Sequence, residues 1–268
     1  MNATHPPPST LPMQYLVVLF VLVAGLRTAS AQIVNVQGAL ATPPEDDGVT
    51  GKLELKVDWR TGNNPLVDVG GGGSILVKRG DLLTLLVARG GYGTSRGLTL
   101  TKRSFEHLRF RYALDCRWRW EAFAQHEYDA FRRLVIRGLV GTGPALQLVA
   151  SKPATVLAGA AYMFELERLD DRAGTFDAGA RSVFHRASFY VTGTHKLGEG
   201  VSITETIYVQ PRLRHPSDVR VFAEVAVTSK LSKRLALSDA LTFAYDRTPP
   251  DEIERLDTQL VVSLILTI

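Results

Sequence analysis

The sequence predicts an all-β fold, an antiparallel transmembrane β-barrel of about 12 strands preceded by a cleaved signal peptide. Two observations lead to this fold class. From residue 51 onward, apolar and polar residues alternate with period two in run after run, and no run has the 3.6-residue period of an amphipathic helix. The last of these runs, 256–268, continues to the final residue of the chain.

The N-terminal region has the features of an export signal. Residues 16–25 form an apolar stretch that is too short to cross a bilayer as a helix. The small residues Ala29 and Ala31 follow it and fit a secretory cleavage site. We therefore expect a signal peptide at 1–31, a flexible periplasmic lead-in at 32–50 and the barrel at 51–268; an anchor that stays attached is the alternative.

The first and last strands determine how the sheet ends. In 52–60, Leu53, Leu55 and Val57 share one face, and charged residues share the other. In 256–268 the alternate positions from Leu260 to Ile268 are all apolar. An apolar edge left open at the terminus would promote aggregation. We therefore expect the last strand to pair with the first and close the barrel.

Ten further strands are expected between these two. Their number is even, as in single-chain bacterial outer-membrane barrels, and the longer connections (94–102, 169–180, 212–217 and 248–255) all fall on one side, which indicates short periplasmic turns opposite longer loops. The expected ranges are 65–78, 82–92, 104–115, 117–128, 131–149, 154–167, 182–196, 201–211, 218–230 and 234–247.

Aromatic residues lie toward strand ends, where they favour girdles at the two membrane interfaces. The other interpretation is that they cap the core of a soluble sandwich. These residues are Trp59, Tyr92, Tyr128, Phe164, Tyr208 and Tyr245.

Charged residues gather on the inward faces of neighbouring central strands. Three interpretations are open: a structural lattice of ion pairs, a selectivity lining that favours anions because arginines exceed acids, or a catalytic or ligand-binding cluster. The residues expected to line the lumen are Arg109, Arg111, Arg117, Arg119, Glu121, Glu127, Arg133, Arg137 and Glu165.

Two acids conflict with the predicted alternation. Glu205 shares its parity with Ile203 and Ile207, and Asp239 shares its parity with Leu241, so simple alternation exposes both acids to lipid. A charged residue there is costly at mid-depth. We expect a β-bulge to reverse the parity at each acid.

Signals for catalysis and for cofactors are weak. His215-Pro-Ser217 has the spacing of a His that could activate a Ser, but Pro216 suits a turn. The histidines have no metal-ligand spacing, and a net charge of +4 spread along the chain does not indicate nucleic acid. The one cysteine, Cys116, cannot form an internal disulfide. The expectation is no enzyme activity, no cofactor, no metal and no nucleic-acid partner.

Several short motifs resemble those of a known family. They are Asp129-Ala-Phe131, 137–143, Thr61-Gly-Asn63, Tyr245-Asp246, Pro249-Pro250 and Asp257-Thr258. With them the chain resembles the YdiY-like salt-induced outer membrane proteins, a Gram-negative family of unknown function. The resemblance implies an exported outer-membrane β-barrel linked to osmotic conditions, without a catalytic residue. A terminal Phe or Trp is usual for recognition by barrel assembly, and Ile268 departs from it.

The function expected from the sequence is that of a porin-like barrel of the cell outer membrane, either a small passive channel or an envelope-structural barrel. An outer-membrane acyl hydrolase and a soluble surface β-sandwich that binds a partner are the alternatives. The expected partners are outer-membrane lipid, the barrel-assembly machinery during insertion, and small anionic solutes.

Overall fold

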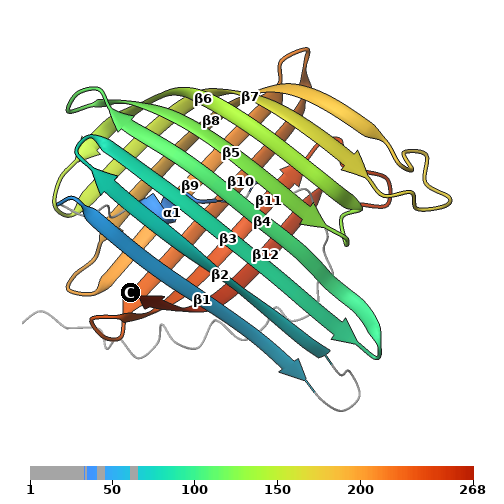
Figure 1. Cartoon of the computed structure of the whole chain (residues 1–268), viewed down its shortest axis with the longest axis horizontal. Coiled ribbons are helices and arrows are strands. Elements are labelled where there is room, and N and C mark those ends of the chain that lie inside the picture. The colour runs from blue at the N-terminus through green and yellow to red at the C-terminus, as the bar shows by residue number, and fades with distance from the viewer. Residues whose placement is uncertain (1–32, 34, 41–45, 61–65) are drawn as a thin grey trace, which may run out of the picture.

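The protein folds into a closed β-barrel, as the sequence predicts (Figure 1). The computed structural model describes residues 33, 35–40, 46–60 and 66–268. The expected signal peptide and the Thr61-Gly-Asn63 motif lie outside the described residues. Within the described part of the chain, no helix is long and apolar enough to cross a membrane.

Twelve strands make the wall, each antiparallel to its neighbours in chain order. Their positions agree closely with the alternation in the sequence. They are β1 (Gly48–Arg60), β2 (Leu66–Arg79), β3 (Leu82–Ser95), β4 (Leu98–Ala113), β5 (Trp118–Asp129), β6 (Leu134–Ala150), β7 (Ala154–Leu169), β8 (Arg181–Lys196), β9 (Val201–Arg212), β10 (His215–Lys230), β11 (Leu235–Asp246) and β12 (Leu256–Thr267).

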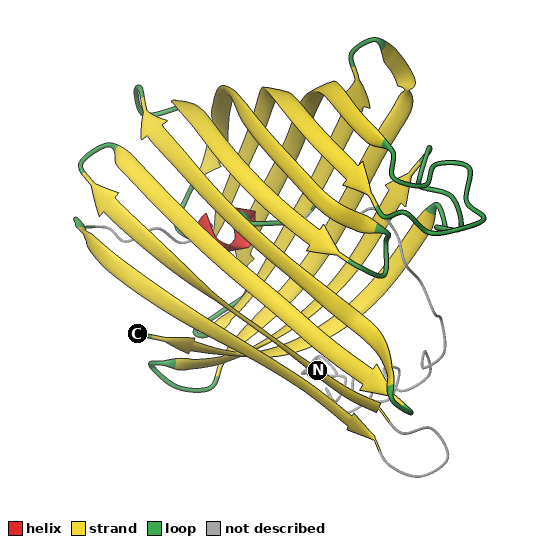
Figure 2. Ribbon diagram, turned by 45° about the vertical axis from the view of Figure 1, so that its right-hand side comes forward, coloured by secondary structure: helices red, strands yellow, loops and turns green. Residues whose placement is uncertain are grey.

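The last strand pairs with the first, which confirms the predicted closure. Lys52–Leu55 of β1 lie opposite Leu264–Thr267 of β12, and the backbones of Gly51 and Ile268 exchange two hydrogen bonds. This is the shortest ladder of the barrel, and it lies where β1 begins and β12 ends. Figure 2 shows the two strands diverging beyond it.

Connection lengths differ between the two rims, although two of the predicted long loops are wrong. The segment 94–102 is a hairpin that turns at Arg96 and Gly97, whose φ angles of 50° and 80° suit a two-residue turn. The link between β9 and β10 is equally short. The long connections 170–180 and 247–255 lie on one rim, called here the long-loop rim, and the opposite rim is the short-turn rim.

Apolar side chains cover most of the outer surface of the wall. Leu55, Val140 and Val262 are each more than half exposed, as residues in contact with lipid tails would be. One of the expected girdle aromatics is placed wrongly, because Tyr208 is buried inside the barrel beside Tyr190, with 5.4 Å between the ring centroids. Tyr208 alternates in step with the inward Thr206 and Gln210, so the alternation of this strand already predicts that it faces inward.

The expected β-bulges at Glu205 and Asp239 are absent from the described strands. Glu205 pairs in unbroken register with Gly193 and Val225, and the ladders on both sides of Asp239 are also regular. Both acids therefore face outward, and the expectation is wrong. Each is the fifth residue from the short-turn end of a twelve-residue strand, so both lie in the half of the wall next to the short-turn rim.

The segment before β1 corrects a second expectation. Instead of forming a flexible periplasmic lead-in, residues 35–40 enter the barrel, where α1 (Gln37–Leu40) lies inside the wall (Figures 1 and 2). Val36 and Leu40 are almost completely buried. β1 also begins at Gly48, before the predicted start of the barrel.

Candidate functional site: the occupied barrel interior

The interior of the barrel contains most of the charged residues that the sequence places there. Alternation on β4 to β7 directs these side chains inward, and six of the nine are buried inside the barrel: Arg109, Arg111, Glu121, Glu127, Arg137 and Glu165. Arg119 is only partly buried, and its Nη1 donates to the backbone oxygen of Arg117 over 3.2 Å.

Arg117 does not line the lumen. It lies exposed in the turn between β4 and β5, where Asp115 Oδ1 accepts hydrogen bonds from the backbone amides of Arg117 and Trp118. These bonds favour the carboxylate and lower the pKa of Asp115. The prediction began this strand one residue too early, because β5 begins at Trp118 and residue 117 belongs to the turn.

Arg133 is buried, but in a loop cluster and not in a strand. It precedes β6, which begins at Leu134, and has a φ of 61°. Its guanidinium bonds to Asp170 at 2.9 Å, to Asp177, and to the backbone oxygen of Asp251 at 3.0 Å. Arg133 therefore joins the two long loops to the wall at the long-loop rim.

A network of ion pairs crosses the half of the interior next to the long-loop rim. Arg220 bonds to Glu165 at 2.8 Å and to Asp246 at 2.9 Å, and Arg137 bonds to Glu167 at 2.8 Å. Two of these pairs join adjacent strands, and the pair of Arg220 with Glu165 joins β10 to β7, which are not neighbours in the sheet. The loop-side network consists of Glu127, Asp129, Arg132, Arg137, Glu165, Glu167, Arg220 and Asp246, in which acids outnumber arginines.

The half next to the short-turn rim has a different charge balance. Glu121 accepts from Arg109 at 2.8 Å and from Arg111 at 2.6 Å, and the hydroxyl of Tyr190 donates to it over 2.9 Å. With Arg119 nearby, three arginines share this one acid. These residues, Arg109, Arg111, Arg119, Glu121 and Tyr190, form the turn-side cluster.

Sequence reasoning on β4 to β7 missed part of the loop-side network. Arg220 and Asp246 come from β10 and β11, where they lie directly opposite each other. Both are inward by parity, so alternation alone could have identified them. The pairing of Arg220 with Glu165 of β7 depends on the curvature of the barrel, which no local pattern contains.

The N-terminal segment (residues 33 and 35–40) binds the turn-side half through amides. Asn35 Nδ2 donates to Glu224 over 2.8 Å, and Arg111 Nη2 donates to Gln37 Oε1 over 2.7 Å. Val36 and Leu40 share an apolar cluster with residues of β2, β3 and β4: Leu76, Leu85, Val87 and Phe105. The segment therefore occupies the lumen with side chains that match both its charged and its apolar surroundings.

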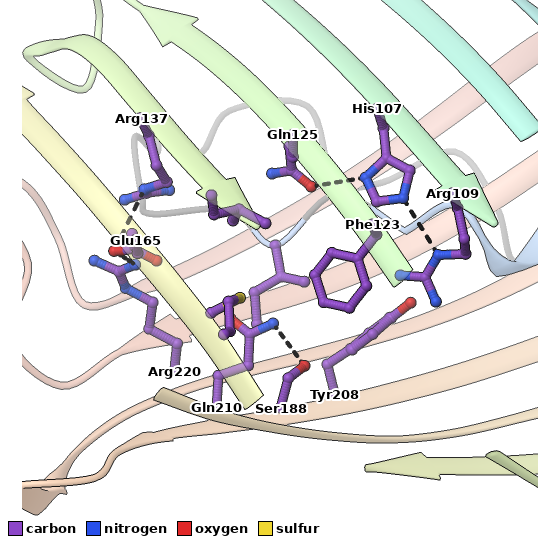
Figure 3. Close-up of a pocket in the computed structure, with 13 residues that line it drawn as sticks. His107, Arg109, Phe123, Gln125, Arg137, Glu165, Ser188, Tyr208, Gln210 and Arg220 are labelled. Carbon is purple, nitrogen blue, oxygen red and sulfur yellow. Dashed lines mark hydrogen bonds and ion pairs between the residues drawn. The ribbon is translucent and has the colours of Figure 1, made fainter. Parts of the chain in front are cut away.

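Little space remains between the two halves. A cavity of about 30 Å³, enough for water but for no larger solute, lies at mid-barrel (Figure 3). Figure 3 shows Arg137, Glu165 and Arg220 at one end of it and His107 and Arg109 at the other. Ile33 of the N-terminal segment also lines it.

The structure places the weak catalytic candidate on the outside. His215 and Ser217 are exposed at the start of β10, at the long-loop rim, and among the described residues no hydrogen bond joins them. Likewise, no group of three or more His, Cys, Asp or Glu side chains in the described part of the chain could hold a metal ion.

Comparison with known proteins identifies the family. Residues 53–268 match the model of the family described as a protein of unknown function, DUF481. The chain belongs to this family. The match confirms the resemblance found in the sequence, including its lack of an assigned function. No curated protein sequence matches the chain.

Solved structures similar to this one are outer-membrane barrels. An outer membrane channel from Pseudomonas putida F1 superposes with a TM-score of 0.50 at 11% identity, covering 85% of this chain and 100% of that one. The NanC porin has a TM-score of 0.47 at 7% identity, covering 82% of this chain and 98% of the porin. At these identities the likeness establishes the fold alone.

Proposed function

We propose that this DUF481 protein is an outer-membrane barrel that its own N-terminal segment keeps closed, and that it conducts small solutes only when that segment leaves the lumen. The observation that carries the proposal is the position of residues 33 and 35–40 inside the barrel, with a cavity of about 30 Å³ remaining. The apolar outer wall and the twelve-stranded closure support a place in the outer membrane.

The same barrel is then a closed structural barrel while the segment is bound and an open channel once the segment has left. While the segment is bound, the loop-side network and the segment together fill the interior. When it is released, the turn-side half empties toward the short-turn rim. The arginines of this half, Arg89, Arg109, Arg111 and Arg119, then outnumber its acids Glu54, Glu121 and Glu224, so small anions are the solutes that its field favours.

An enzyme is not favoured by this geometry. Hydrolysis by a Ser and a His requires the two side chains within hydrogen-bonding reach. His215 and Ser217 are exposed at the start of β10 instead, and no hydrogen bond joins them among the described residues. We therefore propose a non-enzymatic role.

Planar-bilayer recordings test the proposal. Val36→Asp places a carboxylate in the apolar cluster formed with Leu85 and Phe105, so it should expel the segment. The unmodified protein should be closed for most of the recording, and Val36→Asp should show steady conductance. Val49→Asp introduces the same charge at an exposed position and should behave like the unmodified protein. Equal conductance in all three proteins would contradict the proposal.

A further inference from the structure

Two arginines lie side by side on the outer face of the barrel. Arg168 is near the end of β7 and Arg181 begins β8, and the two are direct cross-strand partners. Both have the parity of the lipid-facing residues Leu166 and Val183. They therefore point outward at the long-loop rim.

No acid within the described residues neutralises this pair. Among the ion pairs and hydrogen bonds of the described chain, none involves the side chain of Arg168 or Arg181, and Nε of Arg168 is buried without a hydrogen-bond partner. The acids nearest to Arg168 in sequence are engaged elsewhere: Glu167 bonds to Arg137 inside the barrel, and Asp170 bonds to Arg133. The pair is a local concentration of positive charge.

Like charges directly opposite each other destabilise a sheet unless an anion lies between them. A guanidinium pair matches a phosphate well, because each guanidinium presents a planar fork of donors to the phosphate oxygens.

The surface beneath the arginines is apolar. Leu166 and Val183 form the next outward pair, about 7 Å along the strands toward mid-barrel, and each is roughly half exposed. Ile136 of β6, the neighbour of Arg168 across the other ladder, is also exposed. Phosphate-binding groups above a lipid-facing apolar surface match the arrangement of headgroup and acyl chains in a membrane lipid.

We propose that Arg168 and Arg181 bind the phosphorylated headgroup of a lipid in the leaflet at the long-loop rim, with its acyl chains against Leu166 and Val183. This inference rests on the proposed membrane location. The outward acids Glu205 and Asp239 lie in the half of the wall next to the opposite rim, away from the two arginines.

Binding is measured by native mass spectrometry of the purified full chain in a neutral detergent, with diphosphorylated lipid A as the probe. The matched probe is the same lipid without phosphates. Inorganic phosphate is a third probe, which separates a lipid site from a site for free anions. The test variant is Arg168→Ala with Arg181→Ala, and the control is Arg117→Ala with Arg214→Ala, which removes the same charge from two exposed turns.

The phosphorylated lipid should bind the unmodified protein and the control within twofold of each other, and the test variant at least tenfold more weakly. Equal binding by all three proteins, or equal binding of the lipid without phosphates, would overturn the proposal. Binding of inorganic phosphate as tight as that of the lipid would overturn its assignment to a lipid. Heat-modifiable migration on gels identifies folded barrels. A folded barrel that does not bind lipid counts against this site alone, whereas absence from the outer-membrane fraction counts against the proposed function.

Discussion

The two halves of the barrel interior are filled in different ways. Next to the long-loop rim, side chains of the strands themselves fill the interior, because Arg220 of β10 bonds to Glu165 of β7 and to Asp246 of β11. Next to the short-turn rim, a segment from outside the wall occupies the lumen through Asn35, Gln37 and apolar contacts.

This difference predicts different roles for the two halves: the loop-side network stabilises the barrel, and the N-terminal segment controls access to the lumen. The ion pairs of the loop-side network connect strands, so they cannot open without disturbing the wall. The N-terminal segment binds through neutral amides and apolar side chains, and its departure leaves every strand ladder intact. A change in the first half should therefore affect unfolding of the barrel, and a change in the second half should affect entry to the lumen.

The largest effect is expected in the loop-side network. Glu165→Gln removes a carboxylate that is 1% exposed and with it the 2.8 Å ion pair to the buried Arg220, which keeps Glu167 and Asp246, so the free energy of unfolding should fall by about 2–3 kcal/mol. Thermal unfolding in detergent measures it. Glu54→Gln, at a side chain 36% exposed, should cost about 1 kcal/mol or less. Similar small losses in both variants would show that water solvates the network.

A substitution in the N-terminal segment should leave the wall stable. Leu40→Ala removes apolar contacts in the cluster with Leu76 and Leu85 and should weaken binding of the segment by about 2 kcal/mol. Limited proteolysis should cleave the segment faster, while the melting temperature of the barrel stays within error. Leu213→Ala, at a half-exposed turn residue, is the control. A lower melting temperature without faster cleavage would mean that the segment is part of the wall's stability.

The charge of the turn-side cluster should determine ion preference. In the Val36→Asp background, reversal potentials under a salt gradient should show anion preference, and Arg111→Glu should reduce or reverse it. The preference should decrease with salt, because the Debye length falls from about 10 Å at 0.1 M to about 3 Å at 1 M. Cation preference before the Arg111 substitution would contradict the charge argument.

The smallest effect is expected at the loops, outside the wall. Burial of Asp177 favours its neutral form, but hydrogen bonds from the Asp251 amide and Arg133 outweigh burial and lower the pKa of Asp177. Its stabilisation is therefore complete above the unfolded value of about 4 and is lost as the pH falls through the lower folded pKa. Hydrogen exchange in 170–180 should increase in that acidic range, and Asp177→Asn should remove the dependence. An unchanged pH profile in that variant would assign the effect to another group.

Much of this account could be predicted from the sequence, because alternation is a local property. It predicted twelve strands, the closure of β12 on β1, and six buried charges. It failed where structure depends on distant contacts. Arg133 was predicted to lie in a strand because its partners, two acids of the loop 170–180 and the backbone oxygen of Asp251, are remote in sequence. Residues 35–40 were predicted to be a flexible tail because their apolar partners lie on three different strands.

Cysteine cross-linking tests the position of the N-terminal segment most directly. In a Cys116→Ser background, Val36→Cys is combined in turn with Leu76→Cys or Leu85→Cys, which face inward, and with Ile75→Cys or Leu86→Cys, their exposed neighbours on the same strands. We expect a disulfide with at least one inward partner and none with the outward partners, and oxidation should hold the barrel closed in bilayers. Equal cross-linking to inward and outward partners, or none to either, would contradict a segment bound inside the barrel.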